Sequence, residues 1–231
     1  MTKAPTSYRT ERILVAALVV LAVLPFAART FAFQPFSIPS GSMKPTLLIG
    51  DYIFVSKSAY GITRYSLPFS LKLFSGRIFA SEPQRGDVVV FRLPRDDSVD
   101  YIFRVVGLPG ESVQMIDGVL NINGVPVKRE RMDDFVDRES GRDVKIRRWR
   151  ETLPNGVSYE TLDILDRGYY DNTPAYNVPP GRYFMMGDNR DNASDSRVMA
   201  QVGYVPFENV VGRAAMIFWS PDNDRIGMPV R

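Results

Sequence analysis

The chain has 231 residues, of which 45% are hydrophobic, carries a formal net charge of +3, and contains neither histidine nor cysteine. Without cysteine there is no disulfide framework and no thiolate metal site, and without histidine there is no Ser-His-Asp triad. The excess positive charge falls in the first thirty residues and the remainder carries 25 basic and 25 acidic residues, so we expect no nucleic-acid partner.

An apolar segment follows the basic N-terminus. Residues 13–28 carry no charge, and with Phe31 and Phe33 the segment extends over residues 13–33. At about 1.5 Å per residue this segment would form a helix of roughly 31 Å, which is enough to cross a lipid bilayer. The basic residues before it predict a cytoplasmic N-terminus, so the rest of the chain would lie outside the cytoplasm. The alternative is a cleaved signal peptide, because residues 30–32 weakly match a small-x-small cleavage site.

A possible nucleophile follows this segment, in the sequence Ser40-Gly41-Ser42. Ser42 could be presented on a tight turn, and with no histidine in the chain its usual catalytic partner would be a lysine with a lowered pKa. The chain has six lysines. Lys44 is a candidate because residues two apart on an extended strand share a face. Glycine, serine and proline also favour ordinary turns, which is the structural alternative for this motif.

Short β-prone runs separated by turn residues follow in chain order, which indicates an all-β protein. They cover residues 35–39, 49–57, 88–91, 101–106, 119–122, 183–186 and 214–219. Asp117-Gly118 and Asn123-Gly124 predict two tight hairpin turns. Residues 65–79 could be a loop that dips into the membrane surface or one that packs on the core. The basic run at residues 145–150 could contact an anionic partner or form a solvated hairpin face.

Four separated blocks together resemble the bacterial type I signal peptidases, membrane-bound serine endopeptidases that remove signal peptides. The blocks are residues 40–47 (SGSMKPTL), 85–89 (RGDVV), 100–110 (DYIFRVVGLPG) and 187–197 (GDNRDNASDSR). The resemblance implies a signal-peptidase-type β-sheet core at residues 34–111 and 181–231, with an inserted β subdomain at residues 112–180. It also implies a cytoplasmic N-terminus at residues 1–12 and a signal anchor at residues 13–33 in the inner membrane.

The resemblance also implies roles for individual residues. Ser42 takes the position of the nucleophile, and Ser40 takes that of the oxyanion-hole hydroxyl. The positions that line the pockets for small side chains are Phe36, Ile38, Pro39, Leu47, Tyr101 and Ile102. The positions with a structural role are Asp188, Arg190, Asp195 and Arg197. An extended peptide would add as a strand in this groove. No cofactor and no metal is expected.

The chain departs from the family at two positions that fit each other. Phe103 stands where the general-base lysine is usual, and Ala193 stands where a serine usually orients that amine. An apolar pocket that depresses a lysine pKa can hold a phenylalanine, and the serine then has no partner to bind. We therefore expect a binder of signal peptides, or of other membrane-protein segments, that has lost its catalytic base. The alternative is an active signal peptidase that uses another base such as Lys44.

Overall fold

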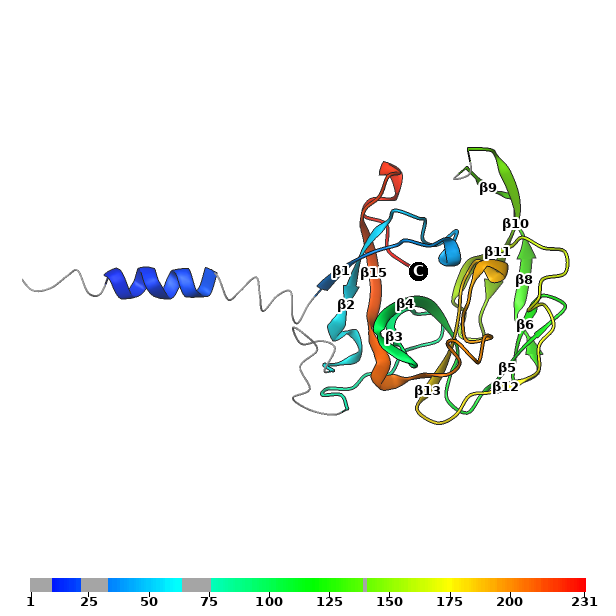
Figure 1. Ribbon diagram of the computed structural model, residues 1–231, viewed down its shortest axis with the longest axis horizontal. Helices are drawn as coiled ribbons and strands as arrows, with labels where there is room; N and C mark the ends of the chain where they lie inside the picture. Colours follow the sequence, from blue (N-terminus) through cyan, green and yellow to red (C-terminus); the bar gives the residue numbers. More distant parts are fainter. Residues whose placement is uncertain (1–9, 22–32, 64–75, 139–140) are drawn as a thin grey trace, which may run out of the picture.

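The computed structural model describes residues 10–21, 33–63, 76–138 and 141–231. Residues 10–21 form a helix, and the other described parts are mainly β-strands and short turns (Figure 1). No helix in these ranges has both the length and the apolar character needed to cross a bilayer. The predicted anchor at residues 13–33 falls partly on this helix and partly, at residues 22–32, outside the described chain. Most of the stretch at residues 65–79 is also outside it.

The largest sheet has seven strands in the order β1-β2-β15-β3-β4-β13-β14 (Figure 1). Its members are β1 (Phe33–Ser37), β2 (Tyr52–Ser56), β3 (Val88–Leu93), β4 (Asp96–Gly107), β13 (Arg182–Met186), β14 (Val205–Pro206) and β15 (Val210–Trp219). All neighbours in it are antiparallel. The N- and C-terminal parts of the described chain therefore share one sheet, because β15 lies between β2 and β3.

Two smaller sheets come from the segment between β4 and β13. One contains β8 (Lys128–Arg131), β9 (Phe135–Asp137), β10 (Val144–Thr152) and β11 (Ser158–Asp163), and the other contains β5 (Ser112–Ile116), β6 (Val119–Ile122), β7 (Val125–Pro126) and β12 (Tyr176–Asn177). Short 3-10 helices complete the fold: η1 (Gly41–Met43), η2 (Lys57–Tyr60), η5 (Arg190–Asn192), η6 (Phe207–Asn209) and η7 (Asn223–Arg225). The expectation of a mainly β-sheet protein is confirmed.

The two predicted hairpin turns are present. Asp117 and Gly118 join β5 to β6 with φ angles of 49° and 72°, and Asn123 and Gly124 join β6 to β7 with φ angles of 53° and 75°. Positive φ at both central residues is the geometry of the tight hairpin turn, and asparagine, aspartate and glycine tolerate it best. Local turn chemistry therefore fixes the register of this sheet.

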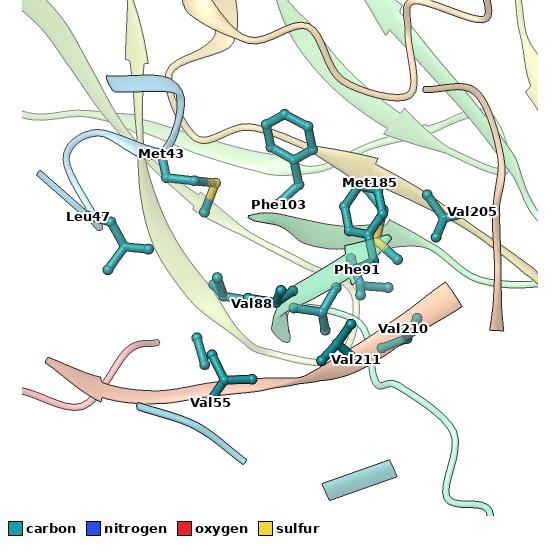
Figure 2. Close-up of a cluster of buried hydrophobic side chains, with 14 of the residues drawn as sticks. Met43, Leu47, Val55, Val88, Phe91, Phe103, Met185, Val205, Val210 and Val211 are labelled. Atoms are coloured by element: carbon teal, nitrogen blue, oxygen red, sulfur yellow. The ribbon is translucent and has the colours of Figure 1, made fainter. Parts of the chain in front are cut away.

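The buried side chains form two clusters, and β13 contributes to both because successive residues of a strand point to opposite faces. Tyr183 and Met185 join the cluster inside the seven-stranded sheet, whereas Phe184 and Met186 join the cluster under β5 and β6. Figure 2 shows side chains of the first cluster, among them Phe103. The two β regions therefore share a continuous packed interior on either side of β13.

Only the last part of β4 has a strand on each side. In this part, Arg104, Val105 and Gly107 pair with β13, and Arg104 also pairs with β3. Residues 100–103 pair with β3 alone. No strand in the described ranges adds to the other edge of residues 100–103. This open edge faces the cleft described next.

Candidate functional site

A cleft of about 400 Å³ lies between the open edge of β4 and the segment that follows β1. Its lining residues are Phe36, Ser37, Ile38, Pro39, Ser40, Ser42, Val90, Asp100, Tyr101, Ile102, Phe103, Asn192, Ser194 and Gln201. Two chain segments that run along the cleft are thus separated by about sixty positions in the sequence. The structure brings together eight of the residues that the sequence predicted for the site.

The two serines lie on a tight turn, which we call the serine turn (Ser40–Ser42). Ser40 has an extended backbone, η1 begins at Gly41, and the hydroxyl oxygens of Ser40 and Ser42 are 3.3 Å apart. Asn189 fixes the other side of the turn: its backbone N–H donates to the Ser42 carbonyl at 3.0 Å, and its side-chain amide donates to the Gly41 carbonyl at 2.9 Å. The hydroxyls therefore face the cleft while the carbonyls are bound to the protein.

Phe103 closes the cleft beneath the serine turn. Its side chain is 2% exposed, and its ring is tilted against Tyr101 and Phe91 at centroid distances of 5.7 and 6.1 Å. Gly187 shows how close the parts of the site are. A Cβ atom placed on Gly187 would be 2.4 Å from the Cβ of Ala193, 2.7 Å from the Ser42 carbonyl oxygen and 3.3 Å from Cε1 of Phe103.

These distances place Ser42, Phe103 and Ala193 around one point, although the three residues come from three separate parts of the sequence. The two side chains that lie beside the Ser42 backbone there are the phenyl ring of Phe103 and the methyl group of Ala193. Neither group can accept or donate a proton, so this part of the site is apolar. Burial of a phenylalanine side chain stabilises the fold by about 1.5–3 kcal/mol.

Lys44 turns away from the cleft. Its aliphatic chain passes close to Gly41, since a Cβ there would be 3.1 Å from Cε and 3.3 Å from Cδ of Lys44. Its Nζ donates to Oδ2 of Asp137 on β9 at 2.8 Å, and the Lys44 side chain is 5% exposed. The cleft lining does not include Lys44.

Three buried ion pairs hold the loop around residues 187–197. Arg104 donates to Asp188 at 2.6 and 2.8 Å, and the Thr46 hydroxyl donates to the same carboxylate at 2.5 Å. Arg197 donates to Oδ2 of Asp195 at 2.8 Å, and the Gly187 backbone N–H donates to the same carboxylate oxygen at 3.0 Å.

The third pair joins Arg190 to Glu151 on β10, with Nη2 and Oε2 2.5 Å apart. The Tyr159 hydroxyl also donates to this carboxylate, at 2.9 Å. Burial alone would lower the pKa of Arg190, but the Glu151 carboxylate outweighs it, so that pKa lies above its ordinary value. The pairs thus connect the loop to β4 and β10.

Leu47 was predicted to line the groove, but its side chain is fully buried in the core and is absent from the cleft lining. The other predicted groove residues do line it. Asp100, Asn192, Ser194 and Gln201 also line the cleft and were not predicted as site residues. Asp100 and Asn192 lie inside sequence blocks that were identified, so their positions next to site residues were the available signal. Gln201 reaches the cleft from a loop and donates to the Tyr101 hydroxyl at 3.0 Å.

Asp100 is the carboxylate of the cleft lining. Burial raises its pKa above 3.8, and the charges of Arg92 and Lys57 lower it in part. The Arg92 guanidinium is 3.1 Å from the carboxylate. Lys57 is itself buried, on η2. The negative charge of Asp100 is therefore balanced by the positive charges of Arg92 on β3 and Lys57 on η2.

The chain matches the family model described as signal peptidase, peptidase S26, over residues 10–219. It is 44% identical over 209 residues to the signal peptidase I of Rickettsia typhi, an alignment that covers 85% of this chain and 77% of that protein. It is 45% identical, with the same coverage, to the signal peptidase I of Rickettsia canadensis. A solved signal peptidase I from Enterococcus faecalis V583 is 29% identical, covers 58% of this chain and 97% of its own, and has a TM-score of 0.33. The chain belongs to the signal peptidase family, peptidase S26.

Proposed function

We propose that this protein binds signal peptides in the cleft between β4 and the segment after β1, and that it has lost the base needed to cleave them. It would keep Ser42 at the nucleophile position and Ser40 at the position of the oxyanion hole. Phe103 would occupy the place of the general base, and Ala193 that of the serine that orients it. The ligands are signal peptides of exported preproteins, or other membrane-protein segments.

The observation that carries this proposal is that two apolar residues, Phe103 and Ala193, lie beside the serine turn. A serine hydroxyl becomes a nucleophile only when a base takes its proton, and that base must be within hydrogen-bond reach. Phe103 and Ala193 lie next to the Ser42 backbone, and we assign to these two positions the places of the base and of its orienting partner. In a Ser-His-Asp protease, loss of the base alone lowers turnover by about 10⁶-fold. A loss of that size would leave no cleavage on a cellular timescale.

The position of Lys44 argues against it as a replacement base. Its amine is held by Asp137 and its side chain is almost fully buried outside the cleft. To act on Ser42, the amine would have to leave this carboxylate and lose its proton. The ion pair opposes this movement, because the amine would give up a charge-assisted hydrogen bond of 2.8 Å.

The shape of the cleft supports an extended peptide as its ligand. The open edge of β4 at residues 100–103 offers unpaired backbone groups, to which a peptide strand can add. Half-buried Phe36, Tyr101 and Ile102 contact the same space from both sides. Main-chain hydrogen bonds would supply affinity, and the pockets would select small side chains at alternate positions.

We also infer a single membrane anchor at residues 13–33, with the N-terminus in the cytoplasm and the β domains outside the bacterial inner membrane. The helix at residues 10–21 supports it, because Ile13, Leu14 and Leu18 are all at least 60% exposed, as lipid-facing side chains would be. The domain bounds of residues 34–111 and 181–231 for the core, with residues 112–180 inserted, belong to this proposal. Protease treatment of spheroplasts should digest the β domains, and their protection would contradict the orientation.

The experiment that tests the binding function uses a fluorescent signal peptide ending in Ala-x-Ala and the purified full chain in detergent. Ile102→Arg places a charge in the cleft and should abolish the anisotropy change on titration. Val125→Arg is the matched control, because Val125 is 64% exposed on β7 and does not line the cleft. Equal binding by both variants would show that the peptide does not use this cleft. No binding by the unmodified protein would contradict the proposal itself.

A further inference from the structure

The β9–β10 hairpin is connected to the serine turn at two places, one near each end of β10. Near its start, Val144 lies opposite Asp137 in the β9–β10 hairpin, and Asp137 binds the Lys44 amine at 2.8 Å. Near its end, Glu151 binds Arg190 at 2.5 Å. Val144 and Glu151 are seven positions apart, which is about 23 Å at about 3.3 Å per residue of strand.

The first connection runs through the Lys44 side chain. The aliphatic chain of Lys44 fills the space next to Gly41, and the backbone N–H of Lys44 donates to the Gly41 carbonyl at 3.2 Å. Lys44 is 4% exposed, and the Asp137 side chain is 23% exposed. The carboxylate thus holds the end of a buried side chain that packs against the middle residue of the turn.

The second connection reaches the turn through its carbonyls. Arg190 is 4% exposed and directly follows Asn189, which donates to the carbonyls of both Gly41 and Ser42. The same Glu151 carboxylate that binds Arg190 accepts a hydrogen bond from the Tyr159 hydroxyl on β11. The position of Asn189 is therefore set by a buried cluster that includes β10.

We propose that the β9–β10 hairpin clamps the serine turn, and that Asp137 is a positioning residue that acts through Lys44 on the orientation of the two hydroxyls. The hairpin cannot shift relative to the turn without breaking the Lys44–Asp137 or the Arg190–Glu151 ion pair. Removal of the Asp137 charge breaks this ion pair, so the Lys44 side chain packs less firmly against Gly41 and the turn gains mobility. Peptide affinity then depends on Asp137, a consequence that rests on the proposed function.

The first test reports on the turn alone and needs no ligand. The chain has no cysteine, so Ser42→Cys introduces a single thiol at the tip of the turn. A nitroxide label on this thiol reports its mobility by electron paramagnetic resonance, and its alkylation rate reports its accessibility. Asp137→Asn in this background should increase the mobility and raise the alkylation rate by about fivefold or more, a typical size for coupling between two sites.

Three further variants separate positioning from general loosening of the hairpin. Asp137→Glu keeps the charge and should restore the original mobility. Lys44→Met keeps the packing against Gly41 but removes the amine, and it should behave like Asp137→Asn. The double variant should be no more mobile than either single one, because residues that act as a pair are not additive. Asp134→Asn is the control: Asp134 pairs with Arg131 in the adjoining loop, and both side chains are at least 36% exposed.

The clamp is contradicted if Asp137→Asn leaves the label as immobile as Asp134→Asn does, or if the effects of Lys44→Met and Asp137→Asn add. A second measurement titrates the fluorescent signal peptide into Asp137→Asn and Asp134→Asn with Ser42 intact. Only Asp137→Asn should weaken binding. A protein that binds no peptide in any form contradicts the proposed function, while the spin-label result still decides the clamp.

Discussion

Replacing Phe103 with lysine and Ala193 with serine should create a peptide-cleaving enzyme. The two side chains lie around the same point beside Ser42, so an amine at position 103 and a hydroxyl at position 193 would be within reach of each other. The four methylenes of lysine replace much of the phenyl ring. The packing cost, with the amine neutral, should therefore remain below the ~3–5 kcal/mol that deletion of a buried aromatic side chain causes.

The environment of Phe103 also determines the pH at which the double variant should work. Its 2% exposure would desolvate the introduced amine, and burial lowers a lysine pKa by up to ~3–5 units. A depression of about 3 units from ~10.4 makes the amine neutral above about pH 7.4, and each unit corresponds to about 1.4 kcal/mol. The folded-state pKa is then the lower one. The free energy of unfolding is therefore highest above the unfolded-state pKa. About 4 kcal/mol of it is lost as the pH falls from that pKa to and through the folded-state pKa.

The assay follows cleavage of a preprotein ending in Ala-x-Ala by the double variant from pH 6 to pH 10. The rate should rise with pH through the pKa of the introduced amine. Phe103→Met with Ala193→Ser is the matched control, because it fills the pocket without an amine and should stay inactive. A folded double variant that binds peptide but cleaves nothing at any pH would refute the assignment of these two positions.

Three further predictions concern the surroundings of the site. Asp188→Asn should lower the free energy of unfolding in urea by about 3–5 kcal/mol, because it leaves the fully buried Arg104 without its carboxylate partner. Gly187→Ala should displace the serine turn and weaken peptide binding, measured by anisotropy, because its methyl group would lie 2.7 Å from the Ser42 carbonyl oxygen. Peptide affinity should increase as the pH falls from neutral towards 3.8, because binding further buries Asp100, whose pKa is already raised by burial, and Asp100→Asn should remove this dependence.

Each of these three has its own check. Asp134→Asn breaks an exposed ion pair and should cost under about 1 kcal/mol, so an equal loss in Asp188→Asn would contradict the reasoning on burial. Gly203→Ala changes a glycine outside the cleft lining, and equally weak binding in both glycine variants would show a general effect on folding. An unchanged pH dependence in Asp100→Asn would assign that dependence to another group.

Local chemistry allowed much of the fold to be predicted from the sequence. The hairpins at Asp117-Gly118 and Asn123-Gly124 follow from residues that tolerate positive φ, and the buried strand at β3 follows from a run of valines. The groove residues next to the serine turn were found because four blocks of sequence match one family. That these residues meet in space could be predicted only from the family match, because the blocks are far apart in the chain.

The parts that could not be predicted depend on long-range packing. Leu47 follows the serine turn closely, yet it points into the core because η1 turns the chain before it. The partner of Lys44 is 93 positions away, in a hairpin whose sequence is rich in charges of both signs. Any of several aspartates there could have been the partner, so only the fold identifies Asp137. The same holds for Gln201, which reaches Tyr101 from a loop.

The central claim is that the cleft binds signal peptides without cleaving them. The most direct measurement incubates a preprotein ending in Ala-x-Ala with the purified full-length protein in liposomes, beside the Ser42→Ala variant, and follows the appearance of the mature product. The account predicts no product with either protein and the same peptide affinity in both. Product that forms with the unmodified protein and disappears in Ser42→Ala would contradict it, and would show an active peptidase that uses a base other than residue 103.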